Sequence, residues 1–295
     1  MWVYSGLAST SSEQSSEAAW LAKRDEAMDA VRRLTPDSPV VNELLVFRSL
    51  SRGEWVEAER QYAAARATAE RQGLKLAIDK RYGQFLLLTG RAREAVGFLE
   101  RAKSLDPLNP VVVSFLAEAL ANAGNLPAAI AEQDRGLQLQ GFQAFRPFAL
   151  ITALATGDRA LIERRLVLVG SGPDLVGPAV TAAMQPFLDR PAEALAELRS
   201  FVATAPPARE LYLAASWAAY FGDPEFALQL LQGSPLQEPG IELGIAVWRP
   251  VMRNVRALPV FKDLVRELGL VDYWRATGNW GDFCRPVGEE DFECN

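Results

Sequence analysis

The chain has 295 residues, and 31 lysine and arginine residues against 37 aspartate and glutamate residues give a formal net charge of −6. It contains no histidine and only two cysteines, which excludes histidine-based triads, histidine-ligated metals and four-thiolate zinc or cluster sites. Hydrophobic residues make up 49% of the chain, and neither a basic run nor an apolar stretch of membrane length occurs. We therefore expect a folded chain with no membrane span and no nucleic-acid partner.

The first 14 residues, MWVYSGLASTSSEQ, have no basic start and no apolar core, so they do not resemble a secretory signal. Their serine-rich composition predicts a flexible arm over residues 1–14. Residues 17–39 then form one amphipathic pattern that is closed by the prolines Pro36 and Pro39. This pattern predicts a helix like the second one of a helical pair, a hint that the chain is a fragment of a longer parent.

A repeat follows, and from Gly90 onward its copies have a step of 32 to 34 residues. Its clearest copies begin at Gly90 and Gly124, and each has an alanine five positions later, Ala95 and Ala129. Each copy holds two amphipathic stretches separated by a Gly, Asn, Asp or Pro turn, which predicts two antiparallel helices. A single pair cannot bury its apolar face, so neighbouring pairs must stack. Further copies are marked by Gly53, Gly157, Asp189 and Gly222.

This spacing resembles the tetratricopeptide repeat. The best copy runs from Asp79 to Pro107 and carries Gly83, where the family has a small residue, as well as Gly90 and Ala95. The resemblance covers about residues 15–235 and implies an all-α, right-handed α-solenoid of about six helical hairpins with no sheet. It implies a scaffold rather than an enzyme, because the repeat itself carries no activity.

Residues 236–295 have a different pattern, which predicts a helical cap and tail. Pro259 opens a helix that ends near Gly269, and aromatic residues are frequent in the segment. We interpret them as a cap over the last solenoid turn, since terminal repeats need a cover. The alternative is an aromatic ligand cage. The aromatic residues in question are Trp248, Tyr273, Trp274, Trp280 and Phe283.

Residues Leu258 to Cys284 resemble the end of the repeat domains of some bacterial signalling proteins, both transcription regulators with a periplasmic repeat tail and adenylate cyclases with a repeat tail. Because the chain has neither a winged-helix head nor a cyclase domain, the resemblance implies a detached sensory or docking module.

The two cysteines, Cys284 and Cys294, lie ten positions apart in the tail. The turn-forming sequence Arg285-Pro286-Val287-Gly288 between them lets the chain double back, so we predict a disulfide. The alternative is two reduced thiols. A disulfide and the resemblance to periplasmic tails favour the periplasm, whereas the absence of a signal favours the cytoplasm; on balance the periplasm is slightly favoured, and the compartment is not assigned.

The sequence has no Walker A motif, no dinucleotide-binding glycine motif and no nucleophile elbow. Gly170-Ser171-Gly172 does not have the spacing of a nucleophile elbow and is interpreted as a loop, and Glu289-Glu290-Asp291 is interpreted as a solvated charge run. We therefore expect no catalytic residue, no metal and no cofactor, and we expect a protein or peptide partner. The set Lys80, Arg81 and Asn122 is too small for the carboxylate clamp that some family members use to hold a C-terminal peptide.

In the family's register the first helix of each pair lines the concave face, which gives candidate partner-binding residues. Two other functions remain possible: a module that senses a small molecule or a regulator, with its pocket near residues 142–154 or 178–187, and a carboxylate-based enzyme. The candidate groove residues are Glu43, Phe47, Lys80, Gln84, Leu87, Ser114, Glu118, Asn122, Tyr212 and Ser216.

Overall fold

The computed structural model of the chain describes residues 23, 26–31, 33–34, 45–46, 48–50, 52–72, 76–139, 145–170, 179–232 and 245–295. The chain divides into two compact units, residues 1–75 and residues 76–295. The described residues are mostly helical, which confirms the all-α class. None of the helices within these ranges is both long enough and apolar enough to span a bilayer. The expected domain boundaries after residues 14 and 235 lie outside the described residues and stay predictions.

In the first unit, the main described element is helix α4 (Trp55–Gln72). Its buried side chains, Ala58, Tyr62, Ala65 and Ala69, recur every three or four residues, as expected for a helix with one apolar face. Gly53, which marks the first copy of the repeat, precedes the helix with a φ of +68°, a conformation that favours glycine.

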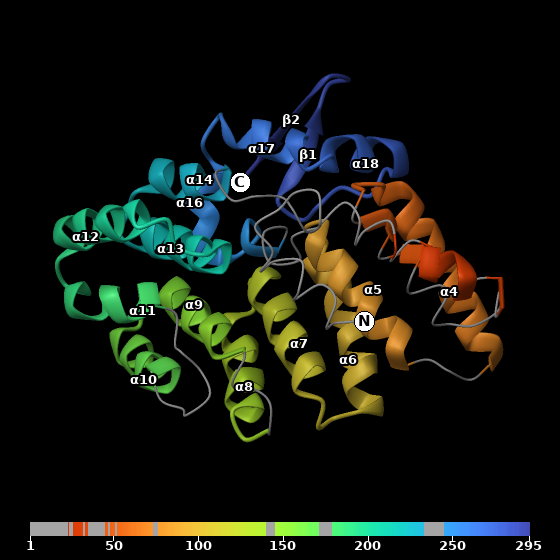
Figure 1. Cartoon of the computed structure of the whole chain (residues 1–295), viewed down its shortest axis with the longest axis horizontal. Helices are drawn as coiled ribbons and strands as arrows, with labels where there is room; N and C mark the ends of the chain where they lie inside the picture. The colour runs from red at the N-terminus through yellow and green to blue at the C-terminus, as the bar shows by residue number, and fades with distance from the viewer. Residues whose placement is uncertain are drawn as a thin grey trace. The chain divides into compact units, whose positions relative to one another are not determined.

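The second unit begins with helices that follow one another at short turns, and consecutive helices pack against each other (Figure 1). The predicted turn glycines Gly90, Gly124 and Gly157 all have left-handed φ values, between +69° and +88°. Gly83 lies where α5 crosses α6, since a Cβ there would come within 2.6 Å of the Leu99 side chain. The helices are α5 (Leu76–Leu88), α6 (Ala92–Leu105), α7 (Pro110–Asn122), α8 (Leu126–Gly136), α9 (Arg146–Thr156) and α10 (Arg159–Gly170).

The weaker copies of the repeat are helical as well. Helices flank Gly157 and Asp189, as their apolar periodicity predicted, although the helix before Asp189 is only six residues long and is followed by a 3-10 turn. The elements after α10 are α11 (Ala179–Met184), η2 (Gln185–Phe187), α12 (Pro191–Ala203), α13 (Ala208–Tyr220) and α14 (Pro224–Gln232).

Residues 245–295, here called the C-terminal segment, contain short helices and a β-hairpin. The expected helix after Pro259 is present and is followed by Gly269 at a φ of +70°. The expectation of no sheet was wrong: β1 and β2 pair antiparallel, with Cys284 opposite Cys294 and Gly288 in the turn at a φ of +64°. The elements are η3 (Pro250–Met252), α16 (Arg253–Arg256), α17 (Phe261–Glu267), α18 (Leu270–Thr277), β1 (Cys284–Val287) and β2 (Asp291–Cys294).

Candidate functional site

Most of the predicted groove residues are buried. Glu43 and Phe47 lie outside the described residues, and Lys80 is partly exposed. The remaining candidates have exposed fractions of 9% or less. They are Gln84, Leu87, Ser114, Glu118, Asn122, Tyr212 and Ser216.

Three of these residues form a stripe along α7, because Ser114, Glu118 and Asn122 follow one another at intervals of one helical turn. Arg249 of the C-terminal segment contacts Glu118 of this stripe and Phe148 of α9. We call this surface, Ser114, Glu118, Asn122 and Phe148, the inner face. The chain's own residues therefore cover part of the surface that the register predicted to be open.

The ion pair at the inner face is buried. Arg249 Nε donates a hydrogen bond to Glu118 Oε1 at 2.7 Å, and the exposed fractions of the two side chains are 5% and 7%. The guanidinium carbon also lies 4.9 Å from the centre of the Phe148 ring, within cation–π range. Because a buried charge is costly without its partner, each of these two side chains requires the other.

Asn122 is different from its neighbours on the stripe. Its exposed fraction is 3%, yet neither its amide oxygen nor its amide nitrogen has a hydrogen-bond partner in the structure. Buried polar groups in folded proteins are nearly always hydrogen-bonded to protein or to an ordered molecule. The inner face thus presents one amide whose full donor and acceptor capacity is unused.

The C-terminal segment is anchored on the turn between α5 and α6. A helix leaves its last carbonyls without partners inside the helix. Within this turn, the carbonyl of Leu88 accepts the indole N–H of Trp248 at 3.1 Å, and the carbonyl of Thr89 accepts that of Trp274 at 3.1 Å. The next carbonyl, that of Gly90, accepts the backbone N–H of Asp282 at 2.8 Å. Three successive carbonyls thus hold three distant parts of the segment.

The same contact region supplies the cap of α6. The residue before this helix, Arg91, makes no side-chain cap, and the backbone N–H of Arg93 instead donates to Asp282 Oδ2 at 2.8 Å. A carboxylate at this end of a helix also interacts favourably with the helix dipole. Arg91 instead contacts the C-terminal segment, because its guanidinium donates a hydrogen bond to the hydroxyl of Tyr273 at 2.7 Å.

Arg256 holds the C-terminal segment together internally. Its guanidinium donates to the carbonyl oxygens of Val247 at 3.0 Å, Arg249 at 2.8 Å and Asn295 at 2.9 Å, and it lies 4.1 Å from the centre of the Phe283 ring. Burial lowers the pKa of Arg256 to about 10, with a smaller contribution from the nearby charge of Arg253. The side chain remains a cation at neutral pH and fixes the path of residues 247–249.

The aromatic residues pack mainly on one another. Trp248 lies 6.0 Å from Trp274 and 6.2 Å from Phe261, measured between ring centres, and all three side chains are fully buried. This packing favours the interpretation as a cap. The sequence predicts a cap over the last helical pair alone. In the structure the cap also covers the turn between α5 and α6, some 160 to 190 residues earlier in the chain.

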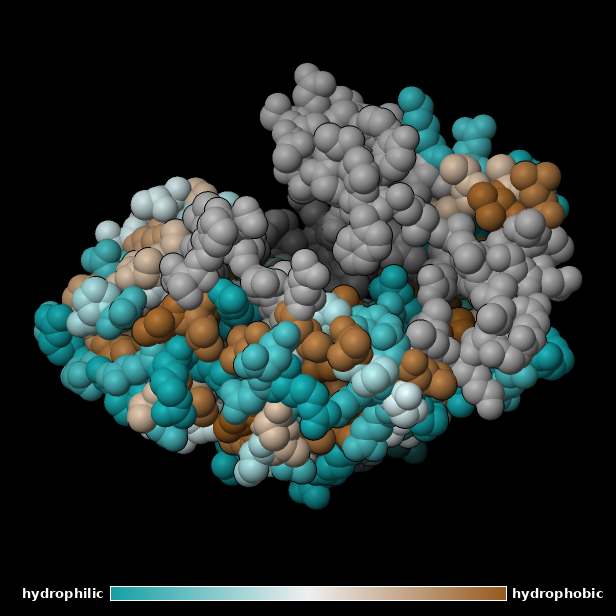
Figure 2. Space-filling model, turned by 90° about the horizontal axis from the view of Figure 1, so that it is seen from below, coloured by the Kyte–Doolittle hydropathy of each residue, from teal (hydrophilic) through white to brown (hydrophobic). Residues whose placement is uncertain are grey.

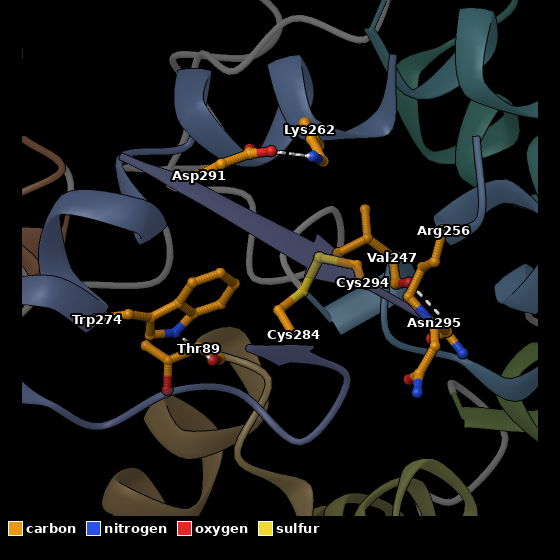
Figure 3. The surroundings of a disulfide bond; sticks show 9 residues. All are labelled: Thr89, Val247, Arg256, Lys262, Trp274, Cys284, Asp291, Cys294 and Asn295. Carbon is orange, nitrogen blue, oxygen red and sulfur yellow. Dashed lines mark hydrogen bonds and ion pairs between the residues drawn. A yellow bond between two sulfur atoms is a disulfide. The ribbon is translucent and has the colours of Figure 1, made fainter. Parts of the chain in front are cut away.

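Figure 3 shows the surroundings of the disulfide between Cys284 and Cys294, which confirms the predicted bridge. Beside it, Lys262 Nζ donates to the Asp291 carboxylate at 2.8 Å. This hydrogen bond and the one from the backbone of Phe292 lower the pKa of Asp291 below its ordinary value. The charge run Glu289–Glu290 lies in the exposed turn of the hairpin.

Arg249, Arg256 and Asp282 were not identified from the sequence. The Trp-Arg-Pro sequence at residues 248–250 is the only local signal among them, since an arginine beside a buried tryptophan needs a partner. Of the residues interpreted as a loop, Gly170 ends α10, and Ser171 and Gly172 lie outside the described residues. In the part of the chain that is described, no group of three or more acidic or cysteine side chains is arranged to hold a metal ion.

No family model matches the sequence, and no curated protein matches it. The interpretation of the inner face therefore depends on its own geometry.

Proposed function

We propose that the chain is a non-catalytic protein-interaction scaffold, a right-handed α-solenoid of about six tetratricopeptide-like hairpins that binds a short segment of a protein partner. The consecutive packing of helices α5 to α10 supports this proposal, as do the glycine turns between them. In the structure, Arg249 of the chain's own segment 247–252 contacts Glu118 and Phe148 of the inner face.

The observation that carries the proposal is the way Trp248 and Arg249 lie on the helices. Arg249 has an extended backbone, with φ −60° and ψ 145°, a conformation favoured before proline. Trp248 is held at the end of α5 and Arg249 in the middle of α7, so adjacent side chains bind two different helices. Residues 247–248 form a turn and residues 250–252 form the 3-10 helix η3, so the segment is bent on both sides of Arg249. Peptides are recognised in a comparable manner, with separate sites for individual side chains.

The inner face also indicates the chemistry of the partner. Glu118 provides a buried negative charge, and Phe148 provides an aromatic ring beside it. A partner segment that replaces residues 247–252 therefore carries an arginine, since its planar guanidinium can satisfy a carboxylate and stack on a ring together.

A peptide added in trans tests this function. We expect the Arg249→Ala chain to bind a fluorescein-labelled peptide with the sequence of residues 246–252, because Glu118 then lacks its internal partner. The Arg249→Ala/Glu118→Gln chain should bind the peptide about tenfold more weakly, because it cannot form the charged hydrogen bond to the arginine of the peptide. Fluorescence anisotropy measures both affinities, and a peptide with alanine in place of its arginine is the matched ligand control.

Photo-cross-linking of the otherwise unaltered chain gives an independent result if the Arg249→Ala chain does not fold. A photoreactive amino acid in place of Lys80, the partly exposed groove candidate, should form adducts with partner proteins in cell extract. The same residue in place of Glu197, which is exposed on α12, should not. Equal adducts at both positions would contradict a binding groove that includes Lys80, and equal peptide affinities in the two variants would contradict binding at the inner face.

The unpartnered amide of Asn122 favours a second function, a small-molecule or regulator-sensing module detached from a bacterial signalling protein. An amide that can donate and accept suits a small polar metabolite. A thermal-shift screen of metabolites distinguishes the two functions: a ligand that raises the melting temperature of the native chain but not of the Asn122→Leu chain supports the sensor.

A further inference from the structure

The β-hairpin of the C-terminal segment has few packing contacts apart from its disulfide. Each strand is four residues long. From Arg285 to Glu293, every residue except Phe292 is exposed. Two-stranded hairpins are marginally stable in water unless they pack against another element.

Phe292 is the buried side chain of β2 that joins the hairpin to the helices. It is fully buried, with its ring centre 6.4 Å from that of Trp274 and 6.3 Å from that of Trp280. The cations of Lys262 and Arg266 lie 5.7 Å and 5.3 Å from its ring centre. The position of Phe292 depends on strand β2, and Cys294, two residues later, is covalently tied to β1.

We propose that the Cys284–Cys294 disulfide is a redox-controlled latch, which keeps Phe292 in contact with Trp274 and Trp280 when oxidised and releases β2 when reduced. The inference does not depend on the proposed binding function. It follows from the contrast between a hairpin that is largely exposed and a single buried anchor that the disulfide holds in register.

The reductant is a dithiol. One of its thiolates attacks the sulfur of Cys294, the less buried of the two cysteines, forms a mixed disulfide and expels the Cys284 thiolate, which takes up a proton. The second thiolate of the reductant then attacks the mixed disulfide. It closes the reductant's own disulfide and expels the Cys294 thiolate, which takes up the second proton. Two electrons thus pass from the dithiol to the protein.

Release of β2 is expected to remain local. The anchors of the segment on α5 and α6 are made by Trp248, Trp274 and Asp282, which precede the hairpin. The contacts that the opened hairpin would carry away from the helices are those of Phe292, Asp291 and Asn295. Reduction should uncover the ring faces of Trp274 and Trp280 together with Lys262 and Arg266, while the helical pairs stay folded.

Hydrogen exchange of the full chain, followed by mass spectrometry, tests the latch. Three states are compared: the oxidised chain, the chain treated with dithiothreitol in native buffer, and the Cys284→Ser/Cys294→Ser chain. We expect residues 284–295 to exchange at least about tenfold faster in the second and third states, whereas α5 to α10 change less than about twofold. Dithiothreitol should not alter the serine variant further, which controls for effects of the reagent.

Several results would overturn the proposal. A smaller increase in exchange at residues 284–295 would show that packing alone holds the hairpin. A parallel loss of protection in α5 to α10 would show that the disulfide stabilises the whole unit instead of a local latch. A disulfide that dithiothreitol reduces only after the chain is denatured would show that the bridge is a permanent structural bond.

Discussion

Helices α5 to α10 and the C-terminal segment form buried cores by different means. In the helices, each element packs on the next one along the chain, and glycines with left-handed conformations set the turns. In the C-terminal segment, short helices and a hairpin are held by contacts to residues far away in the sequence. Packing of each helix on its neighbour in the sequence therefore builds the first region, whereas contacts between residues distant in the sequence build the second.

Figure 2 shows that hydrophobic and hydrophilic residues are interspersed over the coloured part of the face it presents. Mixed surfaces of this kind are normal for folded proteins. The difference lies in the buried contacts, and substitutions there should affect the two regions unequally.

The largest effect is expected for the buried ion pair. Glu118→Ala leaves the Arg249 cation buried without its partner, and we expect a loss of about 3–5 kcal/mol in the free energy of unfolding. The matched change in the helices is Glu163→Ala, which breaks an exposed pair with Arg159 within α10 and should cost about 0.3–0.5 kcal/mol. Urea denaturation measures both values. Similar losses would remove the distinction between the regions.

A smaller loss of stability is expected for substitutions at the turn glycines of the helices, one of which contacts the C-terminal segment. Alanine at Gly90 or at Gly124 must adopt a left-handed conformation, which costs about 1–2 kcal/mol. At Gly124 the new Cβ has no neighbour within 4 Å, but at Gly90 it lies 3.2 Å from the Trp248 ring. Gly90→Ala should therefore cost roughly 1 kcal/mol or more beyond Gly124→Ala, from crowding in the core. Equal melting temperatures for the two variants would show that Trp248 yields without cost.

Replacing the capping side chain of a helix by alanine typically costs about 1 kcal/mol of stability, and two such caps permit a third test. Asp158 caps α10 locally, through the N–H of Leu161 at 3.1 Å, whereas Asp282 caps α6 from a distant part of the chain. In hydrogen exchange, Asp158→Ala should reduce protection in α10 alone. Asp282→Ala should reduce it both in α6 and in residues 278–295. Loss confined to α6 would contradict the mutual support of the two elements.

The smallest effect concerns pH. The pKa of Asp291 is lowered in the folded chain, mainly by the hydrogen bond from Lys262, so its stabilising contribution is present above its ordinary value of 3.8 and is lost as the pH falls through the folded pKa. Lys262→Met should therefore be slightly less stable than the native chain at about pH 7 and equally stable at about pH 2. Thermal melting across this range measures the difference. A difference that persists in acid would point to the Lys262 contact with Phe292 rather than to the charge.

The sequence predicted the features that depend on neighbours along the chain. Gly90, Gly124 and Gly157 were recognised as turns because a helix end requires a residue that tolerates positive φ. The disulfide was predicted because a turn separates the two cysteines. Each of these inferences needs only a short stretch of sequence.

The return of the C-terminal segment could not be predicted in this way. Asp282 has no feature that distinguishes it as the cap of α6, and Arg249 has no feature that assigns it to Glu118. For the same reason, Ser114, Glu118 and Asn122 were placed on one face from the helical period, while their burial under another segment was not foreseen. The hairpin was missed because its strands are only four residues long and largely exposed.

The contacts between the turn at residues 88–90 and the C-terminal segment have a consequence for how such a chain can change length. An array in which each pair touches only its neighbours can gain or lose whole pairs with little disturbance. Here the two ends of a long stretch are joined by Trp248, Trp274 and Asp282. Inserting or deleting a helical pair between residues 90 and 248 would move the two indoles and Asp282 away from the turn at residues 88–90. We therefore expect the length of this stretch to tolerate little change.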